Sequence, residues 1–363
     1  MSTLSAFQPR WASAPGDTIR EALEERQLSV EDLADRLTLT DADARRLVLG
    51  DLPINTVLAE GLAASIGGTA RFWSDREAQY QQSLGLLRAD EIAEKLPISQ
   101  MAEFGWIQTA DNWEERAQYA LRYFGVQDAE SWNERWGKVL ENTRFRTSPS
   151  FASADAAIAV WLRQAEIEVD TMKIGPWSSE AFRAALRAIR AITKLGDPVL
   201  FVPKVQALCA SAGVAVAFVR APKGCKVSGA AFLAHNQIPT IVLSARHLTD
   251  DHLWFTFFHE SGHVLQHELS SAFLDTFDED VDASVNETEA DDFAQEILLP
   301  HGLEQMHSRT SAPTMREVVL FASAIGIAPG IVVGQLQHAG LVEQNRLNKL
   351  KRRYVWDGTT LKT

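Results

Sequence analysis

The sequence predicts an α+β protein that is mostly helical, with one small sheet packed against a buried helix. Three observations predict this fold class. Short, well-capped helical segments occur near the N-terminus, the middle of the chain continues in a helical pattern, and β-prone runs appear only after Pro203. We therefore expect four parts, which comprise residues 1–86, 87–200, 201–300 and 301–363.

The first part is expected to be an N-terminal helix-turn-helix bundle. Ser29 with Asp32 three residues later forms a pattern close to a capping box. Thr40 is a second N-cap, and it begins the helix DADARRLVL, which Gly50 ends. Two short helices joined by so short a turn indicate a helix-turn-helix.

The helical middle region, residues 87–200, connects this bundle to the predicted sheet. Three short β-prone runs follow, at Gly213–Val219, Val227–Ala234 and Pro239–Ser244. The next segment, DDHLWFTFFHESGHVLQHEL, is apolar nearly all round at its start, which is typical of a buried helix. The last part, residues 301–363, is expected to add helices that pack onto this region.

The buried helix carries the pattern HExxH, at His259, Glu260 and His263. Spacing of four residues places both imidazoles on one face, about 6 Å apart along the helix axis, so that they can share one cation. Glu260 leaves from the same turn and is placed to act as general base on an attacking water. A buried helix that matches by chance, or a zinc site kept for stability, would also fit these residues.

Two histidines do not complete a zinc site, and the later helix ETEADDFAQEILLP offers carboxylates for the third position. On a helical wheel, Glu287 lies about 50° from the buried direction, and Glu289 lies about 110° from it. Glu287 is therefore the better candidate ligand. Asp291, one turn further, is expected to accept the second N–H of a ligand histidine and so fix its orientation.

Other histidines are weaker candidates. His267 continues the series from His259, but the two residues are about 12 Å apart along a helix, too far to share an ion. We expect His267 to be a capping or surface residue. His301 and His307 are candidates for stabilising the transition state, although the sequence gives no geometry for them.

The two segments WFTFFHESGHVLQH and ETEADDFAQEILLP resemble the ImmA/IrrE family of metallo-endopeptidases. The spacing of Glu287 and Asp291 is also similar to the ExxxD element of thermolysin-like zincins. The resemblance implies a zincin-like peptidase domain with Zn²⁺ held by His259, His263 and Glu287, and with Glu260 as base. PTIVLSARHLTDD resembles the edge strand of the family, which is expected to pair with an extended substrate.

Residues 10–85 resemble the HigA-like branch of the XRE helix-turn-helix family, and this combination is familiar in bacteria and phages. The resemblance implies cleavage of a repressor or a partner regulator. The start of the second helix departs from the family, since Asp41 and Asp43 stand where polar or basic side chains usually face DNA. Arg45 and Arg46 follow and are the candidate DNA contacts. DNA binding, dimerisation as a homodimer and partner recognition therefore all stay open.

The net charge of −13 argues against nucleic-acid binding by bulk charge, and the first 80 residues hold eight Arg, no Lys and thirteen acidic residues. Nine acidic residues and no Lys or Arg lie between Asp275 and Asp292, beside the proposed metal helix. The last 20 residues are basic instead, with six Lys or Arg and one Asp, and are expected to be a solvated helix end, with a nucleic-acid contact as the alternative.

Other features concern the compartment and the class of function. No run approaches 18 apolar residues, no secretion signal is recognised, and only two cysteines occur, so we expect a cytoplasmic protein with no membrane partner. The first functional hypothesis is a zinc endopeptidase that cuts a regulator. The alternative is a DNA-binding regulator or antitoxin-like protein whose zinc domain senses a signal or acts as a scaffold.

Overall fold

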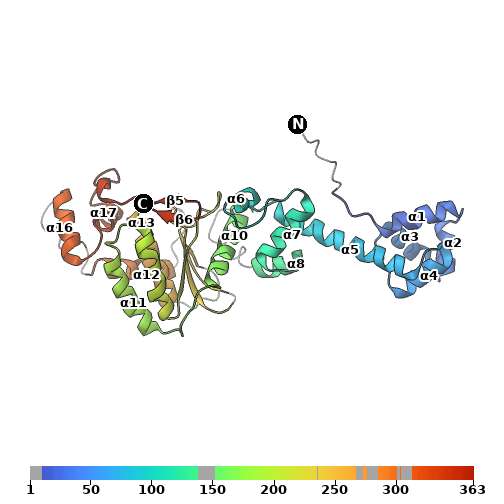
Figure 1. Cartoon of the computed structure of the whole chain (residues 1–363), viewed down its shortest axis with the longest axis horizontal. Helices are drawn as coiled ribbons and strands as arrows, with labels where there is room; N and C mark the ends of the chain where they lie inside the picture. Colours follow the sequence, from blue (N-terminus) through green and yellow to red (C-terminus); the bar gives the residue numbers. More distant parts are fainter. Residues whose placement is uncertain are drawn as a thin grey trace. The chain divides into compact units, whose positions relative to one another are not determined.

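The computed structural model describes residues 10–137, 152–234, 236–266, 273–275, 285–300, 303 and 313–363. The chain divides into two compact units. The N-terminal unit comprises Met1–Glu94 and Gln108–Trp132, and the C-terminal unit comprises Lys95–Ile107 and Asn133–Thr363. The fold is mostly helical with small sheets, as the sequence predicts (Figure 1).

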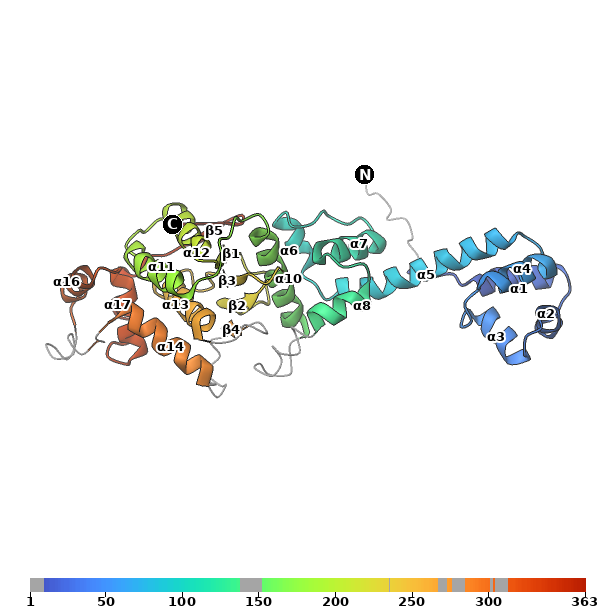
Figure 2. The same cartoon turned by 90° about the horizontal axis from the view of Figure 1, so that it is seen from below.

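The N-terminal unit is entirely helical in the part that the structure describes. Its elements are α1 (Pro15–Glu25), α2 (Val30–Leu37), α3 (Asp41–Leu49), α4 (Thr56–Ile66), α5 (Ala70–Ala93), α7 (Trp113–Phe124) and α8 (Ala129–Trp132). Within this unit, one part of the long α5 contacts α1 and α4, and α5 also packs on α7 and α8 (Figure 2). Helix α5 thus continues past residue 86, where we placed a boundary, and the four-part division stays a prediction.

The capping residues form the helix ends that the sequence indicates. Ser29 and Asp32 make a complete capping box at the start of α2, and Thr40 accepts the backbone N–H of Asp43 at the start of α3. The left-handed conformation of Thr38 (φ 56°) forms the tight turn between these helices. The apolar faces then meet in a core that includes Trp73, which is 1% exposed.

The C-terminal unit contains a four-stranded sheet in the order β1-β3-β2-β4. Its strands are β1 (Ala215–Phe218), β2 (Gly229–Leu233), β3 (Pro239–Leu243) and β4 (Phe273–Asp275). The three predicted β-prone runs are confirmed, but the expectation that PTIVLSARHLTDD supplies an edge strand is wrong. Strand β3 pairs with β1 in parallel and with β2 antiparallel, so both of its backbone edges are occupied.

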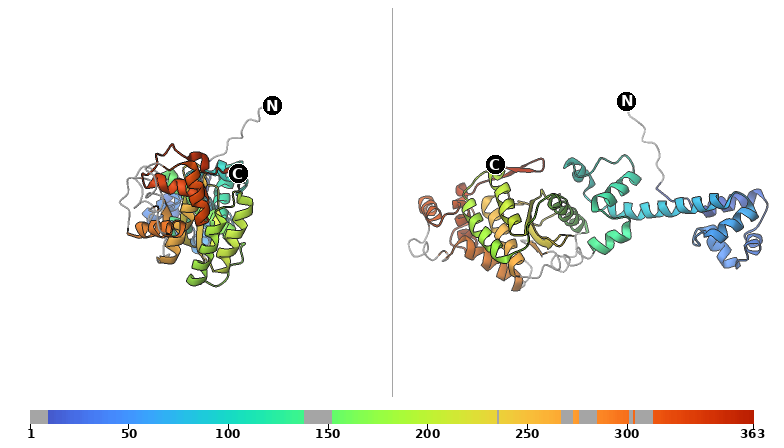
Figure 3. Two further views of the ribbon diagram at one scale, coloured as in Figure 1. Left: turned by 90° about the vertical axis from the view of Figure 1, so that its left-hand side faces the viewer. Right: turned by 60° about the horizontal axis from the view of Figure 1, so that its bottom comes forward.

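Helices cover both faces of this sheet. The helical elements of the unit are α6 (Ile98–Glu103), a π-helical turn (Asn133–Gly137), α10 (Ala152–Val169), α11 (Ser179–Ile192), α12 (Pro198–Ser211), α13 (Asp250–Gln266), α14 (Val285–Leu298), α16 (Met315–Ile325), α17 (Pro329–His338) and a 3-10 turn (Asn348–Leu350). Helices α10 and α13 lie on opposite sides of the strands, as Figures 2 and 3 show. Because both faces are covered, strands β1, β2 and β3 are buried along nearly their whole length.

The C-terminal segment differs from the solvated helix end that we expected. It forms a hairpin of β5 (Val355–Asp357) and β6 (Thr360–Lys362), joined by the two residues Gly358 and Thr359, where Gly358 (φ 58°) adopts the positive φ that tight hairpin turns require. Tyr354 is 1% exposed and joins the main core of the unit. The aromatic and β-branched residues on either side of the turn indicate a hairpin. We gave more weight to the basic residues, which suggested an exposed helix end.

In the described residues, no single helix is both long enough and apolar enough to cross a membrane, although α16 and α17, bent by 112° at their junction, pass that test as a pair. Cys209 and Cys225 are both buried and form no disulfide.

Candidate metal centre

Helix α13 lies between the sheet and α14, and this position explains its apolar sequence. It contacts β2 and β3 on one side and α14 and α17 on others, so residues around most of its circumference are buried. His259 is 3% exposed, Glu260 is 0% exposed and His263 is 1% exposed. Three polar side chains are thus held inside an apolar helix, where each needs a specific partner.

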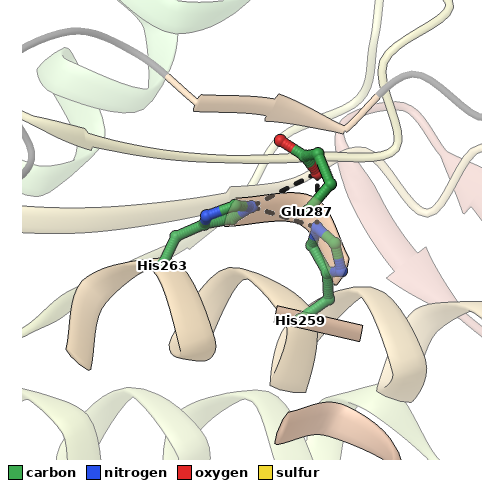
Figure 4. Close-up of side chains that lie close together, drawn as sticks. All are labelled: His259, His263 and Glu287. Atoms are coloured by element: carbon green, nitrogen blue, oxygen red, sulfur yellow. Dashed lines mark hydrogen bonds and ion pairs between the residues drawn. The ribbon is translucent and has the colours of Figure 1, made fainter. Parts of the chain in front are cut away.

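Glu287, in the first turn of α14, meets the two histidines at one point (Figure 4). Its Oε2 atom lies 3.2 Å from Nε2 of His259 and 3.5 Å from Nε2 of His263. The two Nε2 atoms are 3.1 Å apart. The structure therefore brings together the three residues that the sequence singled out as ligands, and Glu289, the other carboxylate considered, is exposed.

These donors fit a zinc ion. Tetrahedral zinc with bonds of about 2.0–2.1 Å places its ligand atoms about 3.3 Å apart, which is close to the three distances found here. Two imidazole nitrogens and one carboxylate are also a usual donor set for catalytic zinc, which leaves a fourth position for other groups.

Electrostatics keep Glu287 in the form that a metal requires. Burial by itself would raise the pKa of Glu287, but hydrogen bonds from His259 and His263 and their positive charges hold that pKa well below its usual range. A carboxylate in this place is ionised at neutral pH, as metal ligands must be.

Asp291 orients the first histidine. Its Oδ1 atom lies 2.8 Å from Nδ1 of His259, one turn of α14 beyond Glu287. An ionised carboxylate accepts hydrogen bonds only, so this contact holds a proton on Nδ1 of His259, and Nε2 is the nitrogen that binds a metal when the ring is neutral. The structure thus gives Asp291 the position that we predicted for it.

Two glycines set the spacing of the site, and our sequence analysis missed both. A Cβ atom on Gly262 would lie 3.1 Å from Cα of Ala290, so the absence of a side chain lets α14 approach α13 closely. A Cβ atom on Gly229 would lie 2.8 Å from Oε1 of Glu260, so this residue of β2 makes room for the predicted base. Gly262 lies inside the HExxH pattern, whereas nothing near Gly229 in the sequence indicates its role.

Arg190 of α11 holds the far end of α14. Its guanidinium donates to the carbonyl oxygens of Ile297 at 2.7 Å and Leu298 at 3.0 Å, and to that of Ile325 in α16 at 2.6 Å. One planar, multi-donor side chain thereby satisfies carbonyl groups at the C-terminal ends of two helices.

The remaining candidates lie elsewhere. His267, His301 and His307 are outside the described residues. Arg45 and Arg46 belong to the N-terminal unit, where Arg45 pairs with Glu31 at 3.0 Å and Arg46 pairs with Asp43 at 3.2 Å. Both arginine side chains are more than half exposed, at 63% and 54%, so their role in binding DNA stays a prediction.

Comparison with known proteins supports a peptidase in one part of the chain. Residues 212–320 match the family model of the IrrE N-terminal-like domain, which is a peptidase family. The matched segment contains the sheet, α13 and α14, and thus the whole donor group, but it does not reach the N-terminal unit. No curated protein and no solved structure gives a significant match.

Proposed function

We propose that this chain is a zinc-dependent endopeptidase that cleaves a regulatory protein, such as a repressor or a partner regulator. The observation that supports this most strongly is the convergence of His259, His263 and Glu287 on one point, with Glu260 directly after the first of them. A site with three protein ligands and an adjacent carboxylate has the composition of a catalytic zinc site.

The residues divide the work of peptide hydrolysis. Zinc bound at this site would act as a Lewis acid toward the peptide carbonyl and the attacking water. Glu260 takes the proton of that water and passes it to the leaving amine. Its burial between α13 and β2 keeps the carboxylate in one place, which favours proton transfer over a short distance.

The decisive variant is Glu260→Gln, which removes the base and keeps the shape. We expect the purified variant to retain about one zinc per chain by atomic absorption, and to lose about 100- to 10,000-fold in the rate of peptide cleavage. The substrates are an unstructured peptide library and the product of the gene beside this one. Glu289→Gln, on the exposed side of α14, is the matched control and should cleave normally; wild-type cleavage by Glu260→Gln would disprove the mechanism.

The N-terminal unit is proposed to direct the peptidase to its target, which is either a protein or DNA. The short turn between α2 and α3 and the exposed Arg45 and Arg46 favour the second candidate function, a DNA-binding regulator or antitoxin-like protein. That function predicts a salt-sensitive mobility shift of the upstream region of the gene, which is lost when both arginines become Ala. Unchanged mobility with the wild-type protein would favour a protein target, consistent with Asp41 and Asp43 at the start of α3.

A further inference from the structure

Strand β4 occupies the backbone edge of β2 beside the predicted base. It is last in the order β1-β3-β2-β4, and its antiparallel register pairs Asp275 with Gly229 and Phe273 with Ala231. Gly229 is also the residue whose missing side chain makes room for Glu260. Since neighbouring strands lie about 4.8 Å apart, the backbone of β4 lies one strand spacing beyond Gly229.

Strand β4 also lies against the metal helix. It contacts α13, which carries both histidines and the predicted base. In Figure 4 it is the short strand across the top of the view, on the side of the donor group where Glu287 lies. A second extended chain therefore cannot pair with β2 at Gly229 while β4 is in this place.

The groups that β4 uses are those that bind extended peptides. The edge of a sheet holds such a peptide through main-chain N–H and C=O groups, whatever the sequence of the peptide. A substrate held on this edge of β2 would have one of its peptide bonds at the level of Gly229, beside Glu260. Strand β4 and an extended substrate are thus alternative partners for one strand edge.

The pairing between β4 and β2 is short. Strand β4 has three residues, and β2 has five. The register with β4 ends at Ala231, whereas all five residues of β2 pair with β3. In the described part of the chain, Phe232 and Leu233 thus have no strand partner on the outer side of β2. A substrate that pairs along all five residues forms more main-chain bonds than β4 does, so it can begin at Leu233 and displace β4 toward Gly229.

We propose that β4 is an autoinhibitory strap, which occupies the place of the substrate on β2 and is displaced during cleavage. The proposal rests on the endopeptidase function and adds a control of the same site. The surface of a fully folded protein offers no extended stretch that could replace β4. The strap therefore restricts cleavage to proteins with an exposed, extended segment.

A disulfide between the two strands tests the strap by locking it. Ala230 and Leu274 are directly opposite in the register, and directly opposite residues of antiparallel strands are within the range of a disulfide. Ala230 lies on the opposite face of β2 from Gly229, so a cysteine there is turned away from Glu260. We expect Ala230→Cys/Leu274→Cys, oxidised with glutathione disulfide, to keep its zinc by atomic absorption. It should cleave the peptide library at least 10-fold more slowly than the same protein after reduction. Leu274→Cys alone is the matched control, and its rate should be the same before and after reduction.

Loosening β4 should have the opposite effect. Successive N–H groups of a strand point to opposite sides, so proline at either Phe273 or Leu274 removes one that faces β2. We expect that variant to cleave at least 5-fold faster than wild type, and Leu274→Val, which keeps every N–H, to cleave at the wild-type rate.

Two outcomes would contradict the proposal in different ways. Equal rates of the oxidised and the reduced double variant would overturn the strap and leave the peptidase function intact, because the substrate would then bind without displacing β4. Absence of cleavage in every form, including both proline variants, would instead disprove the peptidase function and the strap with it.

Discussion

The two ends of helix α13 both bury polar groups, but they do so in opposite ways. At its N-terminal end, Asp250 and Asp251 are 0% and 5% exposed, and they meet groups of opposite polarity. Lys351 pairs with Asp251 at 2.6 Å, and the backbone N–H of Arg352 donates to Asp250 at 3.0 Å. Toward the other end, the metal-binding atoms of His259, His263 and Glu287 converge on one point, and no Lys or Arg is among this group.

This difference separates a group that holds the helix in place from a group that can bind a metal. At the N-terminal end each carboxylate meets a donor that the chain itself supplies, which is Lys351 for Asp251 and the backbone N–H of Arg352 for Asp250. Two imidazole nitrogens and a carboxylate oxygen within 3.5 Å of one another repel unless a proton or a metal ion lies among them. The first arrangement contains its own donors, whereas the second calls for an added cation.

The largest effect should come from adding and removing zinc. Zinc at about 1,000 times its Kd should raise the free energy of unfolding of the wild-type protein by about 4 kcal/mol, because the unfolded chain does not hold the three donors together. In His263→Ala this increment should disappear. Urea denaturation with zinc and with a chelator measures both values, and an equal zinc increment in wild type and variant would refute the assignment of His263.

The N-terminal end of α13 should respond in the opposite sense. Lys351→Met removes the ammonium group that pairs with the buried Asp251, and should lower the free energy of unfolding by about 3 kcal/mol in the presence or absence of zinc. Lys349→Met, at an exposed position two residues away, is the matched control and should have little effect. A zinc increment that vanished in Lys351→Met would mean that the two ends are not independent.

The smallest effect is a pH dependence at Asp250. Burial, and next the charge of Asp251, raise the pKa of Asp250 from 3.8 to about 7. Between about pH 4 and pH 7 the unfolded chain has therefore released a proton that the folded chain still holds, so folding stability decreases as the pH rises.

Asp250→Asn removes this titration and keeps an oxygen for the N–H of Arg352. The wild type should lose about 2–3 kcal/mol more than the variant between pH 4 and pH 7, measured by urea denaturation at each pH. All other titrating groups are common to both proteins, so parallel stability curves would show that Asp250 does not titrate in this range.

Local patterns in the sequence predicted much of the site. Helical spacing placed His259 and His263 on one face, and the wheel of α14 favoured Glu287 over Glu289. Capping rules likewise predicted the starts of α2 and α3, because the groups involved are three residues apart. Such interactions depend on neighbours in the chain, and a sequence contains that information directly.

Contacts between distant segments were not predictable in the same way. The space at Gly229 matters because β2 packs on Glu260 thirty-one positions later. The interior position of β3 likewise depends on its pairing with both β1 and β2. Lys351 was assigned to a solvated helix end because its charge suggested exposure, yet it pairs with the oppositely charged Asp251, a hundred residues before it. A buried ion pair between distant segments is recognised only when the positions of both segments in the fold are known.

The contacts of Arg190 have a consequence for precision at the ion. Each residue of an α-helix advances about 1.5 Å along the axis, whereas metal–ligand distances tolerate only about 0.2 Å. Helix α14 is a rigid element with Glu287 near its N-terminal end. About ten residues further along, Arg190 donates hydrogen bonds to two of its carbonyl groups. The guanidinium therefore restrains α14 from sliding along its axis. A residue remote from the metal donors thus fixes the position of the third ligand, Glu287.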